Sequence, residues 1–114
     1  MVILDEGLIK WRDLVNASLT KGQLGTGTST VTPGDTGLDE GVGATLKDLS
    51  NNTSDKLLTT SFGISTTEGN GLSFTEFENQ FDTGESLIRI RHTAINKDNI
   101  TELTYVVTYE FEGE

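Results

Sequence analysis

The stretch that decides the fold is TELTYVVTYEFE, residues Thr101–Glu112. Its five apolar residues at alternate positions share one face of a strand: Leu103, Tyr105, Val107, Tyr109 and Phe111. Two residues is the repeat of a β-strand, whereas a helix would spread the same side chains around its surface. The opposite face is mostly glutamate and threonine, which is typical of an antiparallel sheet with one face toward water. We therefore expect this strand to be the structural spine of its sheet, with its tyrosines and Val107 largely buried.

Shorter strand signals precede this segment, separated by clusters of turn-forming residues. Strands are predicted at residues 18–24, 44–49, 56–64, 72–77 and 86–93, and turns at residues 51–54, 68–71 and 82–85. Short strands joined by such turns are typical of two packed sheets or of a barrel. The sequence therefore predicts a mainly β fold, either an antiparallel β-sandwich or an open barrel.

One α-helix is predicted, at the N-terminus, over residues 4–17. Apolar side chains recur there at helical spacing: Leu4, Leu8, Trp11 and Val15, widened by Leu14. Asp5 and Glu6 lie in the first turn, where carboxylates interact favourably with the positive end of the helix dipole. Because the helix has a single apolar stripe, we expect it to pack either against the sheet or against the same helix of a neighbouring subunit.

A long stretch rich in glycine and threonine, residues 25–43, follows the first weak strand signal. Pro33, Gly34 and Asp35 give a turn signal within it. The stretch is too long for a tight turn, so we expect an ordered surface loop that packs over a sheet. At 114 residues the chain is expected to form one domain, residues 1–114, with its β-rich part over residues 18–114.

The charge of the chain limits its partners. Eighteen acidic against eight basic residues give a formal net charge of −10. Such a surface repels phosphate backbones and anionic lipids, so we expect neither nucleic acid nor a membrane as partner. The first residues are acidic where a signal peptide is basic, which predicts synthesis in the cytoplasm. The absence of cysteine excludes disulfides and thiol chemistry.

Residues that could carry chemistry are few. The glycines at positions 25 and 27 lack the lysine and helix of a phosphate-binding loop. The acids at positions 35, 39, 40, 82 and 85 match no EF-hand spacing, and solvated side chains explain them more simply. His92, the one histidine, is expected beside the core, and no nucleophile-elbow sequence accompanies it. The sequence therefore predicts no catalytic residue, no cofactor and no metal site, and we do not expect an enzyme.

Two arginines stand out in this acidic chain. Arg89 and Arg91 lie on the opposite face of their strand from His92. They are expected either to pair within the chain, with acids such as Glu76, Glu78 or Glu110, or to form an ion-pair patch for a partner subunit. The candidate residues for an interface with another subunit are Trp11, Leu24, Phe81, Arg89 and Arg91.

Short motifs run in a fixed order along nearly the whole chain. They are Gly7-Leu8, Arg12-Asp13-Leu14, Leu24–Thr28, Pro33, Asp35-Thr36, Leu38-Asp39, Glu68–Gly71, Phe74-Thr75-Glu76, His92–Lys97 and the alternating final strand. In this combination the chain resembles a family of small virion proteins of tailed bacteriophages and archaeal tailed viruses. The family usually continues its threonine-glutamate pair with an apolar hinge, and this chain departs from that pattern at residues 77–81.

The resemblance implies a virion component without established catalytic residues, associated with tails, fibres or head attachments. We therefore expect a non-enzymatic structural subunit of a tailed virus, made in the host cytoplasm and present in the virion as a tail, tail-fibre or head-decoration component. It would form homo-oligomers and dock onto other virion proteins, with residues 25–43 and 79–85 supplying much of the contact. A carbohydrate- or host-surface-binding module is the alternative, and a small hydrolase is a more distant one.

Overall fold

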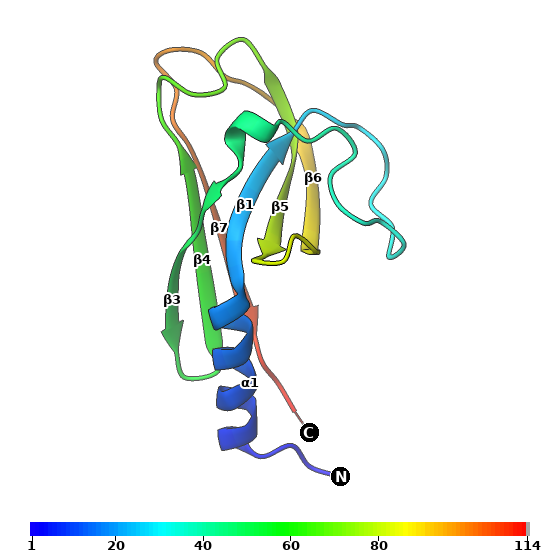
Figure 1. Cartoon of the computed structure of the whole chain (residues 1–114), viewed down its shortest axis with the longest axis vertical. Coiled ribbons are helices and arrows are strands. Elements are labelled where there is room, and N and C mark those ends of the chain that lie inside the picture. Colours follow the sequence, from blue (N-terminus) through cyan, green and yellow to red (C-terminus); the bar gives the residue numbers. More distant parts are fainter. Residues whose placement is uncertain (114) are drawn as a thin grey trace.

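Two antiparallel sheets packed face to face make up most of the computed structural model, which describes residues 1–113 (Figure 1). The elements in chain order are α1 (Asp5–Ser18), β1 (Leu19–Gly25), the 3-10 turn η1 (Gly43–Thr45), β2 (Lys47–Asp48), β3 (Ser50–Ser54), β4 (Leu57–Ile64), β5 (Ser73–Phe81), β6 (Ser86–Asn96) and β7 (Leu103–Glu110). The first sheet has the order β2-β1-β5-β6, and the second has the order β3-β4-β7. The predicted mainly β sandwich with one N-terminal helix is confirmed, and the strands described do not close into a barrel.

The core lies between the sheets and is largely aromatic. Phe62 of β4 and Phe77 of β5 have ring centroids 5.1 Å apart, and Phe77 stacks on Tyr105 of β7 at 4.5 Å. Leu24, Ile64, Phe74 and Leu103 complete the buried cluster. The inward positions of β4 are all buried, since this strand is hydrogen-bonded on both sides within its sheet. Burial of this contiguous apolar surface is the main stabilising contribution to such a fold.

The alternation read from the final strand is confirmed, but its expected place in the sheet is wrong. In β7 the inward residues are buried or half-buried and the outward residues are exposed. The strand pairs with β4 only, so it is an edge strand, and the centre of its sheet is β4. Tyr105, Val107 and Tyr109 are therefore only half-buried. Side-chain alternation reports which face is covered, not how many strands flank the segment.

The predicted turn at residues 51–54 is also wrong, because these residues belong to β3. Ser50 to Ser54 pair residue by residue with Ser61 to Leu57 of β4, and the reversal takes place at Asp55, whose φ is +50°. Asparagine and serine favour turns, but here they form a short polar edge strand. In residues 44–49 only Lys47–Asp48 forms a strand, while β5 and β6 continue past their predicted ends.

The two sides of the sandwich are closed differently. On one side the chain passes from β2 to β3 through Leu49 alone, and this side chain packs against the core. On the other side β6 and β7 are joined by residues 97–102, at one end of the sandwich (Figure 1). We call the first the closed side, and we call the edges of β6 and β7 together the open side.

Candidate interaction surface

Helix α1 begins and ends close to the predicted residues but packs differently. It lies at one end of the sandwich, where its C-terminal part runs beside the β3–β4 hairpin and its N-terminal part extends past the strands (Figure 1). Leu8 is its one buried residue. The rest of the face that it turns toward the sandwich makes polar contacts. The Arg12 guanidinium donates to the Asp55 carbonyl, and Asn51 Nδ2 donates to Asn16 Oδ1 at 3.1 Å. Of the two predicted arrangements, burial of the apolar stripe within the chain is complete only at Leu8, and packing against the same helix of a neighbouring subunit stays a prediction.

Two large apolar side chains of α1 remain exposed. Trp11 is 52% exposed and Leu14 is 57% exposed. The indole ring of Trp11 has one aromatic neighbour, Phe111, with ring centroids 6.1 Å apart. Exposed apolar area of this kind, when contiguous, marks interaction sites more often than isolated surface leucines do.

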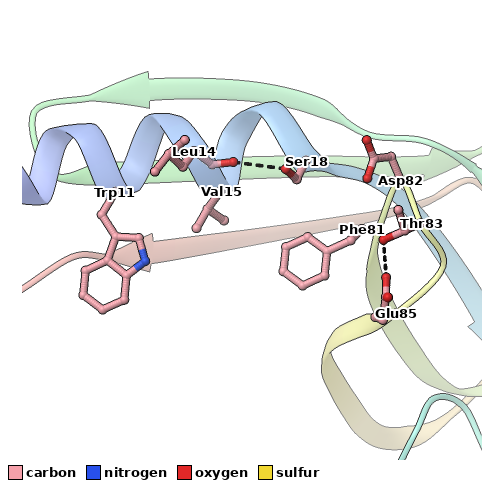
Figure 2. Close-up of a pocket in the computed structure, with 8 residues that line it drawn as sticks. All are labelled: Trp11, Leu14, Val15, Ser18, Phe81, Asp82, Thr83 and Glu85. Carbon is pink, nitrogen blue, oxygen red and sulfur yellow. Dashed lines mark hydrogen bonds between the residues drawn. The ribbon is translucent and has the colours of Figure 1, made fainter.

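These side chains line an open groove between α1 and the β5–β6 turn, which we call the α1 groove. Its volume is about 580 Å³, and it is lined by Trp11, Leu14, Val15, Ser18, Phe81, Asp82, Thr83 and Glu85. Figure 2 shows the rings of Trp11 and Phe81 on the same side of the helix, with Val15 between them. The groove thus brings together two of the predicted interface residues, Trp11 and Phe81.

Backbone hydrogen bonds fix the turn against the end of the helix. The Asp82 amide donates to the Ser18 carbonyl at 2.8 Å, and the Phe81 amide donates to the Glu85 carbonyl at 2.8 Å. A hydrogen bond from the Thr83 hydroxyl, with a backbone contribution, lowers the pKa of Glu85. One end of the apolar groove therefore carries a carboxylate that stays ionised at neutral pH.

A second cluster of polar contacts, on the outer face of the four-stranded sheet, holds the Arg89 side chain in position. Residues 26–41, which we call the covering loop, lie over the outer face of the four-stranded sheet, as predicted for an ordered loop. The loop is closed at its base, where the Thr26 amide donates to the Glu40 carbonyl at 2.9 Å. Beneath it, Arg89 Nε donates to Glu76 at 2.8 Å, and the guanidinium also reaches Asp35 at 3.0 Å. The prediction that Arg89 pairs within the chain is confirmed.

Glu76 is the centre of this cluster and is fully buried. Its carboxylate accepts hydrogen bonds from the amides of Gly27, Asp39 and Glu40, all between 2.8 and 2.9 Å, in addition to Arg89. Burial acts to raise the pKa of Glu76, but these backbone and guanidinium hydrogen bonds outweigh burial and lower it. The carboxylate therefore stays ionised and holds the covering loop on the sheet.

The remaining predicted interface residues divide between core and surface. Leu24 is completely buried in the core, so its expected contact with a partner is wrong: Phe62, Phe77 and their neighbours already cover it. Arg89 is likewise enclosed by the covering loop, with its side chain 4% exposed. Arg91 is exposed and forms no ion pair within residues 1–113. Trp11, Phe81 and Arg91 are the predicted residues that the structure leaves accessible.

His92 lies on the inward face of β6, beside the core as predicted. Its Nε2 and the Tyr105 hydroxyl share a hydrogen bond of 2.8 Å, and its Nδ1 lies 2.8 Å from the Thr93 carbonyl. Burial raises the pKa of Tyr105 to about 12, so its hydroxyl remains protonated. Within residues 1–113, no three His, Cys, Asp or Glu side chains gather to hold a metal ion.

Sequence reasoning missed two features of these surfaces. One is the partial exposure of Ile88 and Ile90, which lie on the same face of β6 as His92. The anchoring role of Glu76 was missed because an acid between Thr75 and Phe77 looks like an ordinary outward strand residue. The sequence did contain one signal for the groove. Trp11 and Leu14 are two large apolar residues three positions apart on the predicted helix, with the polar Arg12 between them.

No helix within residues 1–113 is long and apolar enough to cross a membrane. Compared with known protein families, curated proteins and solved structures, the chain shows no significant match. The likeness to small virion proteins therefore depends on the motifs quoted above alone.

Proposed function

We propose that the chain is a non-enzymatic structural subunit of a tailed-virus particle, a tail, tail-fibre or head-decoration component that self-associates and docks onto other virion proteins. The observation that carries this proposal is the α1 groove. Its apolar side chains stand on a helix that is fastened to the sandwich mainly through polar contacts. Covering Trp11, Leu14 and Phe81 in an assembly would remove apolar surface from water, which favours association.

The motif series supports the viral part of the proposal, and the groove supports the docking part. A groove with an apolar floor and an acidic end fits a partner that offers an apolar side chain next to a lysine or arginine. Aromatic residues such as Trp11 frequently dominate the energy of such contacts. In this proposal the sandwich is a rigid support, and α1 presents the docking surface.

Two experiments test this function. Mass spectrometry of purified particles of the virus that encodes the chain should detect the protein in stoichiometric amounts, and its absence would reject the proposal. Particles assembled with Leu14→Ser should lose the subunit, because the variant removes apolar area from the groove and leaves the core intact. Leu46→Ser is the matched control, since Leu46 is also an exposed leucine but lies away from the groove.

A carbohydrate-binding module is the second candidate, and one observation favours it. Trp11 is half-exposed in the same open groove as the carboxylates of Asp82 and Glu85. An aromatic platform can stack on the apolar face of a sugar, and carboxylates accept hydrogen bonds from hydroxyl groups. A glycan array on the purified protein, with Trp11→Ala as comparison, would show binding that depends on Trp11. Absence of any such binding would leave docking as the function of the groove.

A further inference from the structure

Lys97 is a buried lysine that the proposed function does not use. It follows β6 directly and is 2% exposed. Within residues 1–113 no carboxylate forms an ion pair with its amine. Its Nζ atom donates instead to two neutral oxygens, Asn70 Oδ1 at 2.7 Å and the Asp98 carbonyl at 2.8 Å. Lysines are almost never fully buried unless they are paired, so the position of this amine needs a physical explanation.

Backbone hydrogen bonds hold Asn70 beside this amine. The Gly71 amide donates to the Lys97 carbonyl, and the Lys97 amide donates to the Leu72 carbonyl, both at 2.9 Å. These bonds continue the β5–β6 ladder and join the loops of residues 65–72 and 97–102, at the end of the sandwich away from α1 (Figure 1). The contact between the two side chains therefore depends on paired backbone and not on two mobile side-chain ends.

The side-chain amide of Asn70 is held at both ends. Its oxygen accepts from Lys97, and its Nδ2 donates to the Thr66 carbonyl at 2.9 Å. A carbonyl bond is about 1.2 Å long, so the Lys97 amine lies within about 4 Å of the Asn70 carbonyl carbon. Groups that react readily are held about 3 to 3.5 Å apart. A small movement of the amine, from the amide oxygen to the carbon bonded to it, is therefore enough for attack.

Asparagine followed by glycine has a competing reaction. In a flexible chain the glycine amide nitrogen attacks the asparagine side chain, ammonia is lost, and hydrolysis of the cyclic product gives aspartate or isoaspartate. Here the Gly71 nitrogen donates to the Lys97 carbonyl and is held in the strand ladder. The Lys97 amine is therefore the better placed nucleophile for the Asn70 side chain.

We propose that Lys97 and Asn70 form an isopeptide bond within the chain. The neutral Lys97 amine attacks Asn70 Cγ, so that a bond forms between Nζ and Cγ and the bond between Cγ and Nδ2 breaks. One proton of the amine passes to the leaving nitrogen, which departs as ammonia. The products are a secondary amide and ammonia, so the step balances without an oxidant, a reductant or a second substrate.

Asp98 supplies a base beside the amine. Hydrogen bonds from the Thr101 hydroxyl and the Ile100 amide, together with the nearby charge of Lys97, lower the pKa of Asp98. Its carboxylate is therefore ionised at neutral pH and takes up the proton that the Lys97 ammonium loses before attack. Lys97 is thus the nucleophile, Asn70 provides the carbonyl carbon and the leaving group, and Asp98 carries the proton.

The bond closes a covalent ring of residues 70–97, which contains β5, β6 and the turn between them. This hairpin supplies Phe74 and Phe77 to the core. Because a closed ring has fewer unfolded conformations, the bond stabilises the fold in the way that a disulfide does. The chain has no cysteine, and this reaction gives it a covalent cross-link of another kind.

Intact-mass spectrometry of the purified full chain tests the proposal independently of any virus particle. The wild type should be lighter than the mass calculated from its sequence by one ammonia. Tandem mass spectrometry of a protease digest should identify a branched peptide that joins Lys97 to Asn70. Lys97→Met and Asn70→Ala should both have their full calculated mass. Lys10→Met is the matched control, since Lys10 is an exposed lysine on α1, and this variant should still lose ammonia.

The role of Asp98 has its own readout. Asp98→Asn should form the cross-linked species more slowly, and mildly alkaline pH should restore the rate because solvent then removes the amine proton. A purely structural role of Asp98 would not give this rescue, and its absence would overturn the assignment of the base.

Three outcomes overturn the isopeptide bond itself. They are a wild type of full mass after incubation at mildly alkaline pH, the mass gain of deamidation in place of ammonia loss, and ammonia loss that persists in Lys97→Met, which would indicate cyclisation at Asn70 and Gly71. Peptide mapping of the wild type requires no variant, so the test holds even if Lys97→Met does not fold.

Discussion

The two faces of β6 reverse the usual rule that polar residues lie outside and apolar residues inside. Arg89 points outward, and its side chain is 4% exposed; its neighbour Ile90 points inward and is 39% exposed. The covering loop lies over the outer face and supplies Asp35 to Arg89, whereas β7 leaves the inner face partly uncovered. The difference teaches that burial on this strand depends on which segment lies over each face, not on the polarity of the side chain.

Removing the charge of Glu76 should give the largest effect on the covered face. Glu76→Gln leaves the buried Arg89 without its main counter-ion, and breaking such a pair costs about 3 kcal/mol or more. Urea denaturation would measure the free energy of unfolding, and amide exchange would report faster opening at Gly27 and Glu40. Glu40→Gln, an exposed acid in the same loop, is the control and should leave stability unchanged. Equal stability of the two variants would show that the covering loop is not held by Glu76.

Acid should weaken the covered face in the same way without a mutation. The pKa of Glu76 lies below its ordinary value of 4.5 in the folded protein. Its contribution to stability is therefore fully present above that ordinary value and is lost as the pH falls through the folded pKa. Backbone amides of the covering loop, followed by NMR during acidification, should remain protected at pH 5 and shift only at lower pH. A loop transition near neutral pH would contradict this sign.

Truncating side chains on the inner faces should distinguish the fully packed part of the core from the part that still contacts water. The effects on the free energy of unfolding should be smaller than that of the Glu76 substitution. Leu58→Ala removes a fully buried side chain from the central strand β4 and should cost about 3 kcal/mol. Ile90→Ala should cost only about 1 kcal/mol in the monomer, because part of that side chain already contacts water. Denaturation at sub-micromolar protein keeps association out of the comparison. Similar losses of stability in the two variants would mean that side chains on the open side are packed as completely as those on the central strand.

Sequence reasoning was sufficient where one physical signal decides the structure. The period of two in residues 103–111 gives a strand, the apolar spacing in residues 4–17 gives a helix, and glycine with proline gives the long loop. These signals are local, since each depends on backbone geometry within a few residues. The helix bounds and the loop were accordingly predicted within one or two residues.

Long-range choices could not be read from the sequence. The alternation in β7 is the same for a central and an edge strand, so its edge position was missed. The asparagines of β3 favour a turn locally but pair with β4 in the fold. For the candidate surface, Trp11 and Phe81 were anticipated as aromatic anchors, whereas Leu24 was assigned to an interface although it completes the core. Burial of that kind depends on partners distant in sequence.

The buried carboxylate of Glu76 also gives the glycine run Leu24–Thr28 a structural explanation. A Cβ atom added at Gly25 or Gly27 would come within 2.5 Å of a Glu76 carboxylate oxygen, and at Gly27 it would also collide with the Asp39 side chain. The substitution Gly27→Ala would therefore push the covering loop away from the Glu76 carboxylate. Any chain that folds a loop over a buried acid in this way requires the same clearance, whatever it binds. Glycine at these two positions is therefore explained by the space that the fold requires and is not evidence for a function. Evidence for function has to come from the α1 groove and the open side.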